Sequence, residues 1–175
     1  MKIIAFAGSN SKKSINKKLA TYVSHLFENA SVEVLDLNDF ALPVFGVDLE
    51  AEIGQPPMAT HFLNKLAIAD IIVMSLAENN GSYSTAFKNT FDWASRQYKD
   101  VFQQKPMLLM ATSPGGRGGA SVLELAKNNL PRYGANIQAV FSLPSFNENF
   151  DIEHNRISNP EFDNQIKEII VNFSL

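Results

Sequence analysis

The sequence predicts an α/β protein of three layers, in which helices cover both faces of a five-stranded parallel sheet. Two observations predict it. Short apolar runs alternate with helical patterns along the chain, and most of these runs are apolar throughout. Strands that are covered on both faces read as continuous apolar runs, whereas strands with one solvated face alternate with polar residues. The runs that we expect to form strands are 2–7, 32–37, 70–75, 106–112 and 136–141.

The helical patterns lie between and after these runs. Ser14 is a good N-cap, and apolar residues recur at helical spacing behind it, so the first helix is expected to begin there. A second, weaker helix at 59–66 follows the helix-breaking pair Pro56-Pro57. A third, at 87–98, has an aromatic face and a charged face, which is typical of a helix packed on a core.

Two further helices complete the pattern. The fourth is expected at 121–130 and ends near Pro131. The fifth, at 159–173, begins with an Asn-Pro pair and carries apolar residues along one face. No internal repeat, linker or low-complexity segment interrupts the chain, so we expect residues 1–175 to form a single domain.

Five parallel strands fit the flavodoxin-like strand order 2-1-3-4-5. In such sheets ligands bind beyond the carboxyl ends of the strands, at the switch between strands 1 and 3. That rule selects the loops after Ala7, Ser75 and Thr112, and all three are rich in Gly, Ser and Asn. The sequence therefore predicts a ligand site at this edge of the sheet.

Composition excludes several other classes of function. The 175 residues carry a formal net charge of −3, which gives no reason to expect nucleic acid as a partner. The chain has no cysteine, so disulfides, thiolate catalysis and cysteine-ligated metals are excluded. The three histidines are far apart and no G-x-S-x-G element exists, so we expect no metal site and no Ser-His-Asp triad. The apolar N-terminal run is too short to span a membrane, and we expect a cytoplasmic protein.

The first loop, residues 8–16, reads Gly-Ser-Asn-Ser-Lys-Lys-Ser-Ile-Asn and leads into a helix. A helix N-terminus favours anions because its N–H groups are free and its dipole is positive there. The loop matches neither G-x-x-x-x-G-K-[ST] nor G-x-G-x-x-G, which excludes those nucleotide-binding motifs. A phosphate cradle and an ordinary capped turn are both open from this loop alone.

The pattern at Gly8, Ser9, Ser11, Ser14 and Asn16 resembles the phosphate loop of the NADPH-dependent FMN reductase family, which includes quinone, chromate and azo-dye reductases. In that family this loop holds the phosphate of FMN. Many members carry Arg where this chain has Ser11, so one fixed charge is missing here. The resemblance covers about residues 1–145 and implies a flavodoxin-like fold, FMN as cofactor and NAD(P)H as reductant.

The second loop, residues 76–83, resembles the segment of the family that frames the flavin ring. Glu78 and Asn80-Gly81-Ser82 match the family pattern, whereas Ala77 replaces its usual Pro and Asn79 its usual Tyr. An Asn-Gly pair is also a standard turn signal, and that simpler interpretation stays open. The missing Tyr predicts an altered selection of substrate shape.

The third loop, residues 113–119, has four glycines in seven positions and resembles the loop that passes beside the flavin in the family. We expect its glycines to let backbone approach a flat ligand. Arg117 is either a charge near the reductant or a solvated loop residue. Together the three loops imply these cofactor-binding residues: Ser9, Ser11, Ser14, Ile15, Asn16, Ala77, Glu78, Asn79, Asn80, Gly81, Ser82, Ser113, Pro114, Gly115, Gly116 and Gly119.

Residues 87–93 resemble a family helix that often packs across a subunit interface. Phe87 and Phe91 are expected in the core, with Lys88 and Asp92 as a surface ion pair. Trp93 falls off the aromatic face, so we hypothesise that it lies at the interface of a homodimer or homotetramer.

The predicted function is hydride transfer from NAD(P)H to FMN, followed in a ping-pong scheme by reduction of a quinone, azo compound or similar small acceptor. The flavin carries the reactivity, so no catalytic side chain is named. Two alternatives stay open: an FMN-binding electron carrier without NAD(P)H activity, and a flavodoxin-like interaction protein without a cofactor.

Overall fold

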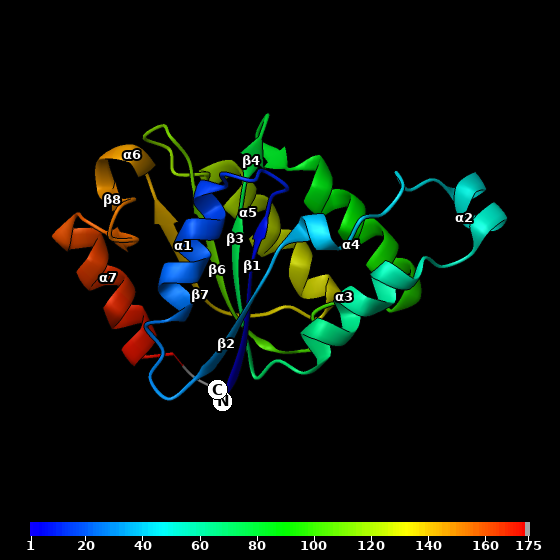
Figure 1. Ribbon diagram of the computed structural model, residues 1–175, viewed down its shortest axis with the longest axis horizontal. Helices are drawn as coiled ribbons and strands as arrows, with labels where there is room; N and C mark the ends of the chain where they lie inside the picture. The colour runs from blue at the N-terminus through cyan, green and yellow to red at the C-terminus, as the bar shows by residue number, and fades with distance from the viewer. Residues whose placement is uncertain (174–175) are drawn as a thin grey trace.

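Five parallel strands form the central sheet in the order β2-β1-β3-β6-β7 (Figure 1), as the sequence predicts for a flavodoxin-like fold. The structure is a computed structural model and describes residues 1–173. The strands are β1 (Lys2–Gly8), β2 (Ser31–Leu35), β3 (Ile71–Leu76), β6 (Pro106–Thr112) and β7 (Asn136–Leu143). Four of the five expected strand ranges shift by one or two residues at an end, and 106–112 is reproduced without change.

The middle strands are buried on both faces, which explains their continuous apolar sequence. In β1, Ile4 and Phe6 join the core on one face of the sheet, while Ile3 and Ala5 join the core on the other. Successive side chains of a strand point to opposite faces, so a run with no polar residue supplies both cores at once.

Helices cover the two faces unequally. α1 (Ile15–Ser24) and α7 (Pro160–Val171) lie on one face, and α3 (Pro57–Ala67), α4 (Thr85–Gln97) and α5 (Ala120–Asn129) lie on the other (Figure 1). All five expected helices are therefore present, with small shifts at their ends. Their beginnings follow the capping signals: the side chain of Ser14 accepts a hydrogen bond from Lys17 N, and that of Asn159 accepts one from Glu161 N.

Several short elements were not expected from the sequence. They are the 3₁₀ turns η1 (Leu37–Asp39) and η2 (Leu130–Tyr133), the helices α2 (Val47–Ile53) and α6 (Phe146–Asn149), and two small hairpins, β4 (Glu78–Asn79) with β5 (Ser82–Tyr83) and β8 (Phe150–Asp151) with β9 (Arg156–Ile157). The expected second strand ends at Leu35, because Asp36 caps η1. None of the residues of α2 is buried, and the helix projects from the side of the molecule (Figure 1).

The hypothesis that Trp93 lies at a subunit interface is wrong for this residue. Trp93 is fully buried within its own chain. Its indole N–H donates to the carbonyl of Pro43 at 2.8 Å, and its ring meets that of Phe45 edge to face at 5.0 Å. Asn89, one turn earlier, accepts a hydrogen bond from Phe45 N. The segment at residues 42–45 is thus an anchor that covers Trp93. The expected ion pair between Lys88 and Asp92 is confirmed at 2.6 Å.

Among the described residues, no helix is both long and apolar enough to cross a membrane.

Candidate functional site

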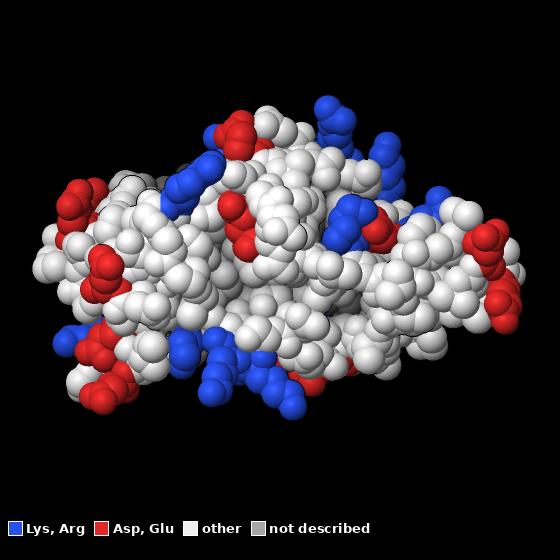
Figure 2. Space-filling view, turned by 90° about the horizontal axis from the view of Figure 1, so that it is seen from above, with Lys and Arg blue, Asp and Glu red and all other residues white. Residues whose placement is uncertain are grey.

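The first, second and third loops lie together at the carboxyl edge of the sheet, where they follow β1, β3 and β6. Strands β1, β3 and β6 are neighbours in the sheet, so their ends bring the loops side by side. Figure 2 looks down on this edge and shows Lys and Arg side chains gathered mainly at the rim, around a hollow lined mostly by uncharged residues. The edge is therefore open to a ligand at the place where the sequence predicts one.

The first loop is a chain of short polar turns. The hydroxyl oxygen of Ser9 accepts a hydrogen bond from Ser11 N at 3.2 Å, and that of Ser11 accepts one from Lys13 N at 3.3 Å. Each hydroxyl that accepts in this way can still donate its own O–H. Ile15 and Asn16 carry the first N–H groups of α1, which have no partner within a helix. The loop thus combines two serine hydroxyls with the first N–H groups of a helix.

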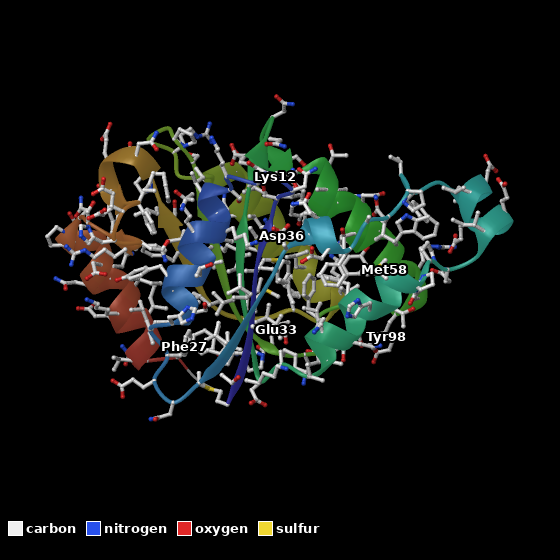
Figure 3. All side chains as sticks on the ribbon, in the orientation of Figure 1. Lys12, Phe27, Glu33, Asp36, Met58 and Tyr98 are labelled. Carbon is white, nitrogen blue, oxygen red and sulfur yellow. The ribbon has the colours of Figure 1, made fainter. Side chains whose placement is uncertain are left out.

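Positive charge surrounds this loop. Lys12 and Lys13 are exposed, and within residues 1–173 neither forms an ion pair (Figure 3 labels Lys12). Lys17 instead pairs with Asp36 at 2.6 Å. Burial acts to raise the pKa of Asp36, but hydrogen bonds from Lys17 and Asn38 outweigh it, and the pKa lies below its usual value. An anion at the first loop would therefore meet free lysines rather than this neutralised pair.

Asn16 is buried, and its side chain is engaged inside the protein. Its amide donates to the carbonyl of Thr112 at 3.1 Å, and its oxygen accepts from Thr112 N at 3.0 Å and from the hydroxyl of Ser75 at 2.7 Å. Only 3% of the residue is exposed. The side chain thus links the first loop to the ends of β3 and β6.

The second loop is the hairpin of β4 and β5. Asn80 and Gly81 form its two-residue turn with φ of 51° and 76°, which are the left-handed values that an Asn-Gly hairpin turn requires. The carboxylate of Glu78 accepts a hydrogen bond from Val122 N at 3.0 Å, in the first turn of α5. Since Gly119 offers this helix no side-chain cap, Glu78 supplies one from another loop. The turn interpretation is correct, and the hairpin still presents Asn79 and Ser82 to solvent.

Ser84 joins the first and second loops, and the sequence analysis did not single it out. Its hydroxyl donates to the carbonyl of Gly8 at 2.8 Å and caps α4 by accepting from Phe87 N at 3.1 Å. A side chain on Gly8 would meet Leu76 at 2.7 Å, so glycine is needed there for close packing rather than for a left-handed turn. A serine directly before a helical pattern is an N-cap signal that would have identified Ser84.

The third loop divides into an open half and a packed half. A Cβ at Gly115 or Gly116 would have nothing within 4 Å, whereas one at Gly118 would lie 2.2 Å from Ser142 Oγ. Gly119, predicted to bind the cofactor, is buried, and a Cβ on it would lie 2.7 Å from that of Ala111. The two packed glycines also have left-handed φ values. The density of glycine in this loop thus has a structural cause in addition to the expected one, because the fold itself needs Gly118 and Gly119.

The predicted site residues fall into three groups by exposure. Exposed are Ser11, Asn79, Asn80, Gly81, Ser82, Pro114, Gly115 and Gly116; partly buried are Ser9, Ile15, Ala77, Glu78 and Ser113; buried are Ser14, Asn16 and Gly119. All belong to the three loops at one edge. Residues that the sequence analysis missed, Ser75, Ser84 and Thr112, are the partners that hold those loops together.

A cavity of about 430 Å³ adjoins the first and second loops. It shares Asn10 and Asn79 with them and is otherwise lined by η1, residues 40–42, Val44, Ser84 and α4. None of its lining residues is charged.

The residues present fit FMN in their chemistry. Hydroxyl and backbone donors with lysines nearby suit a phosphate, and the exposed glycine pair and the exposed Asn-Gly hairpin offer backbone and amide groups to a flat ring. No group of three His, Cys, Asp or Glu residues that could hold a metal is found in residues 1–173.

Comparison with known proteins agrees with this arrangement. A family model described as NADPH-dependent FMN reductase matches residues 1–148. The NADPH:quinone oxidoreductase of Arabidopsis thaliana is 32% identical over 129 residues, which are 71% of this chain and 64% of that protein. The quinone reductase of Escherichia coli (strain K12) is 31% identical over 121 residues, which are 69% of this chain and 64% of that protein. The chain thus spans just under two thirds of the length of these relatives.

The solved structures include FerB, described as a flavoenzyme NAD(P)H:(acceptor) oxidoreductase, from Paracoccus denitrificans. It superposes with a TM-score of 0.77 at 25% sequence identity, over 98% of this chain and 94% of that chain. The family implies FMN as cofactor and NAD(P)H as reductant. On the match of residues 1–148, the chain belongs to the NADPH-dependent FMN reductase family.

Proposed function

We propose that this protein binds FMN at the three loops and uses NAD(P)H to reduce a quinone, an azo compound or a similar small acceptor. The observation that carries the proposal is the meeting of the three loops at one sheet edge, where α1 begins and where the third loop has an exposed glycine pair. Overall, NAD(P)H gives up a hydride, and a quinone gains two electrons and two protons, one of them from solvent.

Each loop has a distinct part in binding. The hydroxyls of Ser9 and Ser11 and the N–H groups of Ile15 and Asn16 hold the phosphate, in the field of Lys12 and the neighbouring lysine. Ser14 is buried and caps α1, so it orients those N–H groups. The exposed edge of the hairpin and the open half of the third loop hold the ring; these are Ala77, Asn79, Asn80, Gly81, Ser82, Ser113, Pro114, Gly115 and Gly116.

Bound FMN would supply the chemistry by accepting a hydride and passing electrons on, while the protein supplies position and electrostatics. The side chains at the site are amides, hydroxyls and backbone groups, and the one carboxylate among them, Glu78, is committed to α5. We therefore assign no catalytic acid or base to the chain.

The uncharged cavity beside the site supports a neutral acceptor. Leu37, Phe40 and Leu42 are among its apolar lining residues, and its polar lining residues carry only amides and hydroxyls. A mixture of apolar surface and neutral hydrogen-bonding groups can bind a small ring that carries carbonyl groups. A neutral ring with carbonyl groups suits this lining better than a charged acceptor.

Steady-state kinetics test the proposal. NADH or NADPH is varied against a benzoquinone at several fixed concentrations in the FMN-loaded protein. We expect turnover with parallel double-reciprocal lines, because both substrates use one site in turn. Intersecting lines would contradict the alternating scheme, and binding of FMN without turnover would favour the electron carrier. A protein that does not bind FMN would favour the other alternative, a flavodoxin-like interaction protein without a cofactor.

Paired variants connect the activity to the first loop. Ser11→Ala removes a hydroxyl donor at the cradle, and Ser31→Ala removes one at the start of β2, on the opposite edge of the sheet. The first is expected to weaken FMN binding several-fold, and the second to leave it unchanged. Equal affinities in both variants would contradict the assignment of Ser11.

A second copy of the chain is the expected partner of α2. This helix has only seven residues and buries none of them, so it has little stability of its own. Val44, Val47 and Ile53 are 77%, 67% and 49% exposed along this segment. We propose a homodimer or homotetramer in which this apolar surface is covered. Light scattering should give a dimer or larger species that Val47→Asp weakens; a monomer at micromolar concentration would contradict it.

A single domain over residues 1–175 and a cytoplasmic location stay predictions.

A further inference from the structure

We propose that Asn16 is a positioning residue whose side chain sets the spacing between the phosphate-binding first loop and the ring-binding third loop. The inference rests on the proposed flavin site and changes the part that the family motif gives to this residue. The backbone N–H of Asn16 stays in the cradle, while its side chain acts through Thr112.

The geometry that carries this is a buried set of three hydrogen bonds. The amide of Asn16 donates to Thr112 O at 3.1 Å, and its oxygen accepts from Thr112 N at 3.0 Å and from Ser75 Oγ at 2.7 Å. Exposure is 3% for Asn16, 0% for Ser75 and 1% for Thr112. The amide therefore pairs with both backbone groups of Thr112, as a neighbouring strand would.

These bonds use most of the hydrogen-bonding capacity of the Asn16 side chain. A carboxamide has two N–H donors and two acceptor lone pairs. Both lone pairs and one N–H are engaged with Ser75 and Thr112. At most one N–H is left for a ligand, so the side chain is a weak phosphate ligand and a strong link within the protein.

The link continues beyond Thr112 into the third loop. The hydroxyl of Thr112 donates to the carbonyl of Leu143 at 2.6 Å, in β7. The next residue, Ser113, accepts a hydrogen bond from Phe146 N at 3.0 Å. The start of the third loop is thus held by α1 on one side and by the segment after β7 on the other.

Only an amide satisfies this position. Thr112 requires both a donor and an acceptor from its partner, and Asn supplies both from one planar group. Aspartate would place a negative oxygen against the carbonyl of Thr112 and bring charge beneath the phosphate. Alanine would remove both groups that Asn16 presents to the buried backbone of Thr112.

Two flavins distinguish positioning from direct phosphate binding. FMN and riboflavin differ only by the phosphate, and their dissociation constants are measured by fluorescence titration. Asn16→Ala is expected to weaken both flavins by a similar factor of ten or more, because the ring and phosphate loops lose their common spacing. Lys12→Ala, which alters charge alone, is expected to weaken FMN a few-fold and leave riboflavin unchanged. Loss confined to FMN in Asn16→Ala would overturn the proposal.

Hydrogen exchange of the flavin-free protein tests the same link without any cofactor. Asn16→Ala is expected to speed exchange of the amides of Thr112 and Ser113 at least tenfold, although they lie 96 and more positions away in sequence. Ser75→Ala removes one of the three bonds and is expected to give a smaller change in the same amides; it is the informative variant where Asn16→Ala does not fold. Lys12→Ala is the control. Unchanged exchange at Thr112 in both variants would overturn the proposal, whereas failure of the wild type to bind FMN would overturn only the proposed function.

Discussion

The third loop contains two glycine pairs that lie in opposite surroundings. Gly115 and Gly116 are exposed, with open space where a side chain would stand, while Gly118 and Gly119 are buried against Ser142 and Ala111. The packed pair lies against Ala111 in β6 and Ser142 in β7, and the open pair leaves its backbone uncovered by other side chains. The glycines of this loop therefore differ in their surroundings: the fold needs the packed pair, and the open pair is accessible to a ligand.

Two asparagines of the loops also differ in their surroundings. Asn79 is exposed on the hairpin, whereas Asn16 is buried and bonded to three groups of the protein. A site built from loops must first hold those loops in place, and this chain uses polar side chains for both tasks. Variants of residues that hold the loops should lose stability, whereas variants of residues proposed to face the ligand should lose affinity for FMN.

The largest effect is expected at the packed glycines. Gly118→Ala should lower the free energy of unfolding by about 2–4 kcal/mol, because it combines a left-handed φ with overpacking. Its Cβ would lie 2.2 Å from Ser142 Oγ and 3.0 Å from Pro144 N. Gly116→Ala is the matched control and should change stability by less than about 0.5 kcal/mol. Urea denaturation of both variants checks this, and equal losses would contradict the division of the loop.

The open glycines should show the reverse pattern. Gly116→Val should weaken FMN binding about tenfold, or about 1.4 kcal/mol, because a branched side chain covers the surface that faces the ring. Its stability without flavin should stay near that of the wild type, since nothing lies within 4 Å of the new Cβ. Flavin titration and urea denaturation on one preparation measure both quantities. An FMN affinity equal to that of the wild type would remove Gly116 from the site.

Two buried N-cap serines allow the effect of a helix cap to be distinguished from the effect of a bond between loops. Ser14 only caps a helix, whereas Ser84 caps a helix and also bonds Gly8 in the first loop. Ser84→Ala should cost about 1–2 kcal/mol, because it removes the cap of α4 and leaves the carbonyl of Gly8 without its partner. Ser14→Ala removes the cap of α1, a single bond to Lys17 N, and should cost about 1 kcal/mol or less. Thermal unfolding of the flavin-free variants shows which of the two substitutions lowers stability more. A smaller loss in Ser84→Ala than in Ser14→Ala would contradict the link between the first two loops.

The smallest effect concerns the ion pair of Lys17 and Asp36. Hydrogen bonds from Lys17 and Asn38 outweigh burial and lower the folded-state pKa of Asp36, so its contribution is present above the unfolded pKa of about 3.9 and is lost as the pH falls through the folded value. Asp36→Asn should reduce stability at pH 7 by up to about 1 kcal/mol and flatten the decline of stability below about pH 5. Chemical denaturation across pH 3–7 tests it, and an unchanged slope would contradict the pairing.

Much of the fold could be predicted because its signals are local and repeated. The apolar run at 106–112 and the cap at Ser14 each specify an element without reference to the rest of the chain. The short elements could not be found this way. α2 has no buried face to give a helical period, and the four-residue α6 begins after Ser145, which adopts a left-handed φ of 45°.

The meeting of the three loops at one end of the sheet was predictable from the strand order. The site residues within the loops were named from the resemblance to the family, and their roles stay predictions. Which of them face a ligand depends on contacts between distant residues, such as Asn16 with Thr112 and Glu78 with Val122. Trp93 shows the same limit, because the segment that covers it lies 50 positions earlier at Pro43.

The central claim is that the three interlocked loops hold FMN, and the visible absorption spectrum of the protein tests it most directly. The purified protein is incubated with FMN and desalted, and NADPH or NADH is then added without oxygen. We expect flavin absorption bands that stay with the protein and bleach on addition of the reductant. A colourless protein after desalting would contradict the claim.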